Sequence, residues 1–405
     1  MGQRIRNKKK VALVLSGGGI KAAAFHIGVC LALREKGFRF AGGSRDEVKK
    51  KYPENPDEDF RTIRLYVGSS AGAFISAILS AGYSLEALID AFEVGSGQGS
   101  SQRDQDSLGR LRPIGYRDVF HMNSRGILKS IPLAILRKSI LSGGLEALLK
   151  DRFKINGLFT TKGIEKYLRE YALSHNEFSQ LGVELFIVGT QLNHTRKAIF
   201  GNFKEKFKTR HTKYVPYASI SDAVAASTSL PPVFAPYGID NKAGKEIFFF
   251  DGEIRDTLST HVAADNGADL VIASYSVHPY HYNPEYGSLH DFGIPVILNQ
   301  ALYQVIQQKI DRHISYLNDI RAIYNATDGY FRQAGLGDEH REKILEIIRQ
   351  RVNYRPNVDY IYVHPRPHDF EMFFADHFSL NSAILDRIVR IGFRAGIHAL
   401  RAYDL

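Results

Sequence analysis

The chain has 405 residues, of which 24% are charged and 44% hydrophobic, proportions that are ordinary for a soluble globular protein. The chain has 53 Lys and Arg against 43 Asp and Glu, a net charge of +10 that favours anionic partners such as a phospholipid surface. Nucleic acid is not an expected partner, because the sequence contains no basic helix interleaved with aromatic residues that could stack on bases. Cys30 is the single cysteine, which excludes an intramolecular disulfide and a zinc site built from cysteines.

The first residues contain no recognisable targeting segment. The apolar run after the basic residues 8–10 is only about five residues long, too short for a signal peptide. Arg6 stands where a myristoylation site has Ser or Thr. No stretch approaches ~18 uninterrupted apolar residues, so no transmembrane helix is expected. These features predict a cytoplasmic or peripheral membrane protein.

Residues 10–15 form an apolar run that predicts a central strand of a parallel sheet. A Ser-Gly-Gly-Gly loop follows at 16–19, and then a helical pattern that ends at Gly37. Such a loop presents backbone N–H groups to an anion, either a nucleotide phosphate or the oxyanion of a tetrahedral intermediate. The dinucleotide-binding pattern fits poorly because Ala22 replaces its last glycine, and the G-K-[ST] ending of a P-loop is missing.

The polar segment 41–60 is expected to be a surface excursion before a second strand at 63–67. The pentapeptide Gly-Ser-Ser-Ala-Gly follows at 68–72 and leads into a helix that continues to residue 79. A sharp turn between a strand and a helix can hold a serine exposed at a helix N-terminus, where developing negative charge is stabilised. Ser70 is therefore a candidate nucleophile, and the alternative is an ordinary turn that caps a core helix.

A helix is expected near 84–92, and the stretch 95–112 after it is rich in Gly, Ser and Gln. The segment 124–154 then carries many apolar residues together with seven Lys or Arg and two acidic residues. An apolar face with a basic rim suits a membrane interface or a lid, and the alternative is a pair of core helices.

Alternating strands and helices over the rest of the chain predict an α/β domain with a helical insertion at about 95–160. Asp251 directly follows the strand predicted at 246–250. In a parallel sheet this would place its carboxylate at the same edge as the glycine loop and Ser70. The catalytic domain is expected at 8–280, with a mainly helical extension at 281–405 packed on it. Further strands are predicted at 183–190, 198–203, 268–275 and 359–364, and helices at 158–174, 217–229, 294–327, 338–352 and 379–402.

The glycine loop at 17–22, the pentapeptide around Ser70 and the Asp251-Gly252 pair together resemble the patatin-like phospholipase family. The block at 225–234, AASTSLPPVF, is similar to a conserved-pattern block of that family, A-S-x-S-x-P-x-x-F. The resemblance covers roughly residues 8–280. It implies a three-layer α/β/α sandwich with a central, mostly parallel sheet, and no cofactor.

The resemblance also implies the roles of the residues. Ser70 would attack the ester carbonyl, and Asp251 would accept the proton without a histidine. Backbone amides of Gly17, Gly18 and Gly19 would stabilise the oxyanion, while Lys21 would either orient the loop or meet a lipid phosphate. The implied activity is a phospholipase A or lysophospholipase type of lipid acyl hydrolysis at an anionic membrane surface, with or without a protein activator.

Two positions depart from the family pattern. Ala22 replaces the last glycine of the loop, and Glu253 follows Asp251-Gly252, where its carboxylate would either raise the pKa of Asp251 or point to solvent.

Other functions fit the same residues. One is a Ser–His–Asp hydrolase that uses His261, His278 or His281. A triacylglycerol lipase or an acyltransferase would use the same Ser–Asp pair, and a lipid-binding scaffold would leave it unused.

Overall fold

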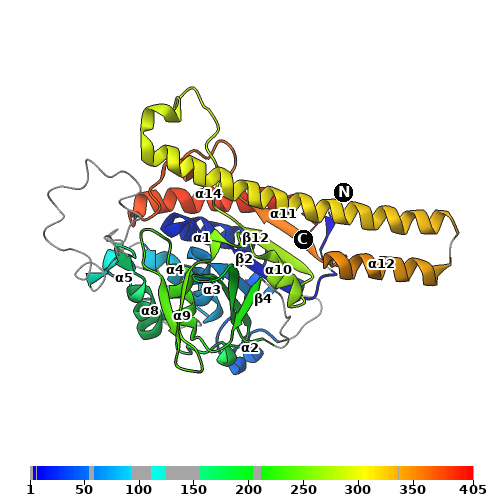
Figure 1. The fold of residues 1–405 in the computed structure, drawn as a ribbon, viewed down its shortest axis with the longest axis horizontal. Helices are drawn as coiled ribbons and strands as arrows, with labels where there is room; N and C mark the ends of the chain where they lie inside the picture. Colours follow the sequence, from blue (N-terminus) through cyan, green and yellow to red (C-terminus); the bar gives the residue numbers. More distant parts are fainter. Residues whose placement is uncertain are drawn as a thin grey trace.

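The computed structural model describes residues 3–5, 7–53, 59–92, 111–124, 156–203, 211–335 and 337–404. A mostly parallel sheet lies between two layers of helices, and a long helical hairpin extends beyond it (Figure 1). This arrangement confirms the three-layer α/β/α fold predicted from the sequence.

Five parallel strands form the centre of the sheet. They run in the order β7 (Glu184–Gln191), β4 (Thr62–Ser69), β2 (Val11–Leu15), β12 (Leu270–Ser274) and β13 (Asp359–Val363). Every residue of β2 and β12 is buried, as expected for strands covered by helices on both faces. Leu15 pairs with Gly68 on one side and with Ser274 on the other, so the carboxyl ends of these strands meet at one edge.

Antiparallel strands complete the sheet beside β7, and they correct one expectation. β11, which delivers Asp251, runs antiparallel to β7 rather than parallel to it. Asp251 pairs with Gly189 of β7. Val188, which precedes Gly189 in β7, pairs with Ser69 of β4. Asp251 therefore reaches the edge near Ser69 from the opposite direction. These outer strands are β8 (Arg196–Gly201), β10 (Tyr237–Asp240) and β11 (Glu246–Asp251). Two further strands join the sheet: β9 (Thr212–Val215) pairs with β8, and β3 (Arg39–Phe40) pairs with β4.

Alternate residues of each central strand face two separate apolar cores. Leu13 of β2 packs into the larger core and its neighbour Val14 into the smaller one. The larger core includes residues of α1 (Gly19–Glu35), α3 (Ala71–Ser80), α4 (Leu85–Phe92), α9 (Ile220–Ser227) and α14 (Ser382–Leu400). The smaller core includes residues of α10 (Thr260–Asp265) and of α11 (Ile294–Gln333).

α1 and α14 approach so closely that their backbones are in contact. A Cβ atom built on Gly28 of α1 would lie 2.0 Å from the Val389 carbonyl oxygen of α14. A Cβ atom on Gly392 of α14 would lie 2.1 Å from the Phe25 carbonyl oxygen of α1. Because only glycine fits at both positions, the two helices are held at a fixed distance.

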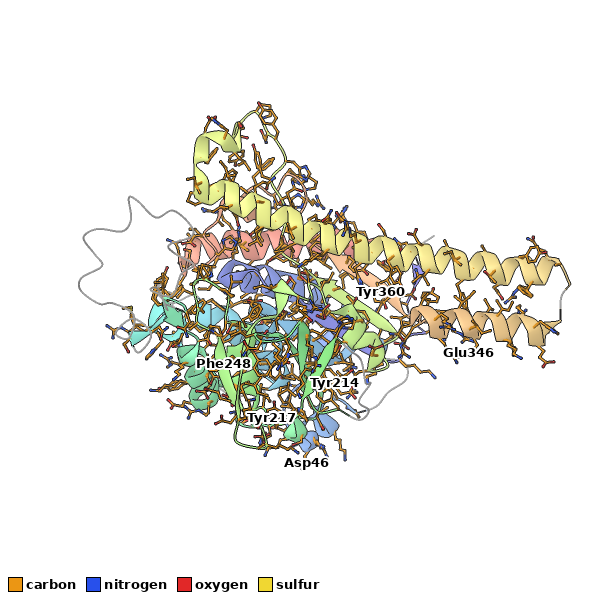
Figure 2. The ribbon with its side chains drawn as sticks, viewed as in Figure 1. Asp46, Tyr214, Tyr217, Phe248, Glu346 and Tyr360 are labelled. Carbon is orange, nitrogen blue, oxygen red and sulfur yellow. The ribbon has the colours of Figure 1, made fainter. Side chains whose placement is uncertain are left out.

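The C-terminal part of the chain contributes to the sheet as well as to the helical layers. Its strand β13 pairs with β12, and β14 (Tyr403–Asp404) pairs in parallel with β1 (Gln3–Arg4). α11 and α12 (Asp338–Val352) form the projecting hairpin, where the helices predicted at 294–327 and 338–352 are found. Glu346 of α12 lies out on this hairpin, whereas Tyr360 of β13 lies at the sheet (Figure 2).

The segment 41–60 is more regular than expected, because it contains α2 (Arg45–Lys51). Ser44 and Glu47 form a reciprocal capping box at the start of this helix. Most of the Gly/Ser-rich stretch at 95–112 and of the basic segment 124–154 lies outside the described residues. The shorter helices and strands are α5 (Tyr116–Val119), β5 (His121–Met122), β6 (Phe159–Thr160), α8 (Lys162–Tyr167) with a π-helical turn at Leu168–Ala172, α13 (Glu371–Phe374), and 3-10 turns at Asp59–Arg61, Phe178–Gln180, Gly252–Ile254 and Leu289–Phe292.

Candidate active site

Ser70 stands at the turn between β4 and α3, in a strained backbone conformation with φ 52° and ψ −121°. Glycines on both sides make this turn sterically allowed: a Cβ on Gly68 would lie 2.5 Å from the Ala73 Cα, and one on Gly72 would lie 2.1 Å from the Leu15 carbonyl oxygen. The sequence therefore forms the sharp turn that was predicted from the pentapeptide.

A second serine holds this turn in place. The Ser70 backbone N–H donates to the Ser227 hydroxyl at 2.8 Å, and that hydroxyl donates to the Val188 carbonyl at 2.6 Å. Ser227 is the first serine of the block at 225–234, whose individual residues carried no predicted role. Its position at the end of α9, beside β7, was not visible from sequence spacing.

Asp251 lies beside Ser70 and is 1% exposed. Its Oδ1 atom accepts a hydrogen bond of 2.9 Å from the Glu253 N–H, and the Ser70 hydroxyl lies close enough to lower the pKa of the same carboxylate. Burial raises the pKa of Asp251 to about 6, because desolvation outweighs the lowering by these two donors. At neutral pH Asp251 is therefore mostly ionised and able to accept a proton.

The glycine loop passes directly over Ser70. A Cβ on Gly17 would lie 2.7 Å from the Ser70 Cβ, and Gly18 and Gly19 have φ values of 133° and 75°, which favour glycine. Among the described residues, no acceptor binds the N–H groups of Gly18 and Gly19. Both amides are therefore available to an anion at the N-terminus of α1.

The Gly17 amide differs from the other two, since it donates to the Glu253 Oε1 atom at 2.7 Å. Glu253 is 7% exposed, so it does not point to solvent. Burial and then the charge of Asp251 raise the pKa of Glu253 to about 8. The effect of like charges therefore falls on Glu253, whereas the raised pKa of Asp251 comes from burial.

Lys21 connects the glycine loop to the C-terminal part of the chain. Its side chain is fully buried, and its ammonium donates to the carbonyls of Met372 at 2.8 Å and Ala375 at 3.2 Å. Burial lowers the pKa of Lys21 to about 7, against the opposing effect of Asp376. The His377 carbonyl accepts from the Ile20 N–H at 2.7 Å, so the same segment also caps α1.

Ala22 lies fully buried inside α1, outside the left-handed backbone region. The missing glycine of the family pattern thus requires no unusual backbone conformation here.

A narrow apolar pocket of about 80 Å³ opens at Ser70. Gly19, Ser70 and Ala71 are among its lining residues, so the pocket includes the serine and one of the two glycines with a free amide. Its walls are mainly aromatic and aliphatic: Ile20, Ala23, Phe74, Phe92, Ile114, Val119, Ile164, Tyr167, Leu230, Phe234 and Phe378, with Asp118 and Thr228. Such a lining suits an acyl chain.

The histidines considered as a catalytic base have other contacts. His261 lies against Lys197 and Asp256, with its Nε2 atom 3.5 Å from the Asp256 Oδ2 atom. His278 and His281 pack on each other, with ring centroids 5.3 Å apart. Within the described part of the chain, no histidine hydrogen-bonds to Ser70 and no cluster of side chains could hold a metal ion.

The fold and the site together define an α/β protein with a serine–carboxylate pair at the edge of a sheet. Residues 13–264, more than half of the chain, match the family described as patatin-like phospholipase. The chain belongs to this family, which confirms the resemblance seen in the sequence. Membership supports lipid acyl hydrolase activity in general, with lipids as substrates. None of the described helices is long and apolar enough to cross a bilayer.

Proposed function

We propose that the protein is a serine hydrolase that cleaves acyl esters of membrane lipids, of the phospholipase A or lysophospholipase type, through Ser70 and Asp251. The position of the Ser70 hydroxyl beside the buried Asp251 carboxylate carries this proposal. It supports direct proton transfer from serine to aspartate, and the apolar pocket beside Ser70 supports a substrate with an acyl chain.

In the first half of the reaction the Ser70 Oγ attacks the ester carbonyl carbon while its proton moves to Asp251. The carbonyl oxygen becomes an oxyanion, which the N–H groups of Gly18 and Gly19 stabilise. When the C–O bond of the ester breaks, Asp251 returns the proton to the leaving alcohol, and the acyl group stays on Ser70. Water then attacks the acyl-serine, loses a proton to Asp251, and releases the fatty acid with Ser70 protonated again.

The family pattern implies three backbone amides that stabilise the oxyanion, and in this mechanism those of Gly18 and Gly19 are free to do so. The third, that of Gly17, already donates to Glu253. Lys21 is proposed to orient the loop rather than to meet a lipid phosphate, because its ammonium is buried against two backbone carbonyls.

Residues 281–405 are proposed to work as part of the same unit as residues 8–280. Phe378 lines the pocket, and the carbonyl of His377 caps the helix that begins at the glycine loop. A catalytic unit that ended near 280 would lack both groups.

The test is the release of fatty acid from phospholipid vesicles, neutral and anionic, by the wild type and by Ser70→Ala and Asp251→Asn. Each variant should lose activity by a factor on the order of 10⁴ or more. Ser76→Ala and Asp240→Asn serve as controls, because Ser76 is buried in α3 without a hydrogen-bond partner in the described structure and Asp240 is exposed. Undiminished activity in either site variant would refute the Ser–Asp pair.

Two other functions are separated by the same assay. Acyl transfer to an added alcohol in preference to water would indicate an acyltransferase with the same pair. Binding to the vesicles without fatty acid release in the wild type, with or without a protein activator, would indicate a lipid-binding scaffold.

A further inference from the structure

Glu253 contacts both halves of the site, and no role follows for it from the family pattern. Its backbone N–H donates to the Asp251 Oδ1 atom at 2.9 Å, and its side chain turns back to accept from the Gly17 N–H at 2.7 Å. One residue thus connects the carboxylate beside Ser70 with the loop that lies over Ser70.

The Glu253 side chain packs directly against the glycine loop at Gly17. A Cβ on Gly17 would lie 2.5 Å from the Glu253 Cγ and 2.7 Å from the Ser70 Cβ. The loop is therefore wedged between the Glu253 side chain and the nucleophile turn. A shift of Glu253 would move the backbone from which the Gly18 and Gly19 amides project.

We propose, on the basis of the function proposed above, that Glu253 is a positioning residue that fixes the glycine loop over Ser70 as a neutral carboxylic acid, and that its ionisation sets the alkaline limit of the activity. The role is indirect, because Glu253 acts through the Gly17 backbone and Asp251.

The surroundings of Glu253 favour the neutral acid at physiological pH. The groups that face it are the carboxylates of Asp251 and, further along the chain, Asp256, together with the Gly17 N–H and the Ser69 hydroxyl. No cation faces it among the described residues, since Lys197 and His261 lie against Asp256 instead. With its pKa raised to about 8, Glu253 is about ten times more often protonated than ionised at pH 7.

Ionisation of Glu253 would oppose the reaction for an electrostatic reason. The attack of Ser70 creates a negative charge on the substrate oxygen, which the proposal places at the Gly18 and Gly19 amides. A second negative charge at Gly17, buried and without a counter-ion, would raise the energy of this intermediate. Activity should therefore fall as the pH rises through about 8.

The experiment compares the pH dependence of kcat/KM for wild type and Glu253→Gln on a soluble p-nitrophenyl ester, corrected for background hydrolysis, from about pH 5 to pH 10. Glutamine keeps a carbonyl acceptor for the Gly17 N–H but cannot ionise. Above about pH 8 the wild type should lose activity by about tenfold per pH unit and Glu253→Gln should not, whereas any loss that follows the deprotonation of Lys21 near pH 7 should be the same in both proteins. Glu246→Gln is the matched control, because Glu246 is exposed at the start of β11.

A second variant tests positioning separately from charge. Glu253→Ala removes the acceptor, so kcat should fall at all pH values by at least about tenfold while KM changes little. Thermal unfolding of each variant checks that it is folded.

The results that would overturn the inference are distinct from those that would overturn the proposed function. A wild-type rate that shows no fall above about pH 8, or a tenfold fall per pH unit above about pH 8 that persists in Glu253→Gln, refutes the role of Glu253. Either result leaves the Ser–Asp pair standing as long as Ser70→Ala is inactive. A Ser70→Ala variant with full activity refutes the proposed function first.

Discussion

The contact between α1 and α14 gives a sharp test of how the glycine loop is positioned. Gly28 is in the middle of this contact, and α1 begins at Gly19, within the loop itself. The perturbation is Gly28→Ala, which adds a single methyl group nine residues after the start of α1.

The expected size of the effect follows from the distances. The new Cβ would lie 2.0 Å from the Val389 carbonyl oxygen and 2.8 Å from the Phe393 N atom, both of which are backbone atoms that cannot rotate away. Non-bonded atoms prefer about 3.5 Å, so the helices must separate by roughly 1 Å or more. Overpacking of this kind lowers the free energy of unfolding by about 1–3 kcal/mol. A shift of about 1 Å carried to the loop would reduce kcat by up to about 10²-fold.

The assay is thermal unfolding followed by circular dichroism, together with kcat on a soluble p-nitrophenyl ester. Gly329→Ala in α11 is the control, because a Cβ there meets no atom within 4 Å. This control should keep wild-type kcat and gain about 0.5–1 kcal/mol of helix stability. If Gly28→Ala unfolds and reacts like the wild type, the close contact does not fix the loop and the reasoning fails.

Further predictions concern the base, the pocket and the loop. In the proposed mechanism Asp251 must be ionised to accept a proton, and its pKa is raised to about 6 by burial. The value of kcat/KM should therefore fall about tenfold per pH unit below about pH 6, and a rate that does not fall there would contradict the proposed role of Asp251. Ala23→Leu adds bulk inside the pocket, so it should reduce kcat/KM for long-chain p-nitrophenyl esters and leave kcat/KM for p-nitrophenyl acetate unchanged. An equal loss of kcat/KM for esters of every chain length would show that the acyl chain binds elsewhere. Lys21→Met should reduce kcat at least about tenfold on phospholipid and on neutral ester alike, whereas a loss confined to phospholipid would indicate a phosphate contact.

The turn around Ser70 and the mostly parallel arrangement of the central strands could be predicted from the sequence, because both depend on local patterns. A buried apolar strand, a pentapeptide of small residues and a helix follow one another within about twenty residues, and each has its own periodicity. The same kind of local signal was available for α2, where Ser44 and Glu47 have the spacing of a capping box. There the many charges of the segment suggested a loop instead.

The rest of the site depends on contacts between residues far apart in the chain. The direction of β11 is set by its pairing with β7, some sixty residues earlier, and the strand pattern around Asp251 reads the same in either direction. Ser227 and Glu253 are polar residues whose inward orientation depends on which backbone groups they meet. Composition and spacing contain no information about those partners.

The capping of α1 by His377 has a consequence for the order in which the protein is made. Ser70 and Asp251 emerge from the ribosome before the segment that carries Met372, Ala375 and His377. Until that segment arrives, the helix that presents the glycine amides lacks its backbone cap and Lys21 lacks its acceptors. We therefore expect the growing chain to have no hydrolase activity until synthesis has passed residues 13–264, the region matched to the family, and has reached the segment that carries His377.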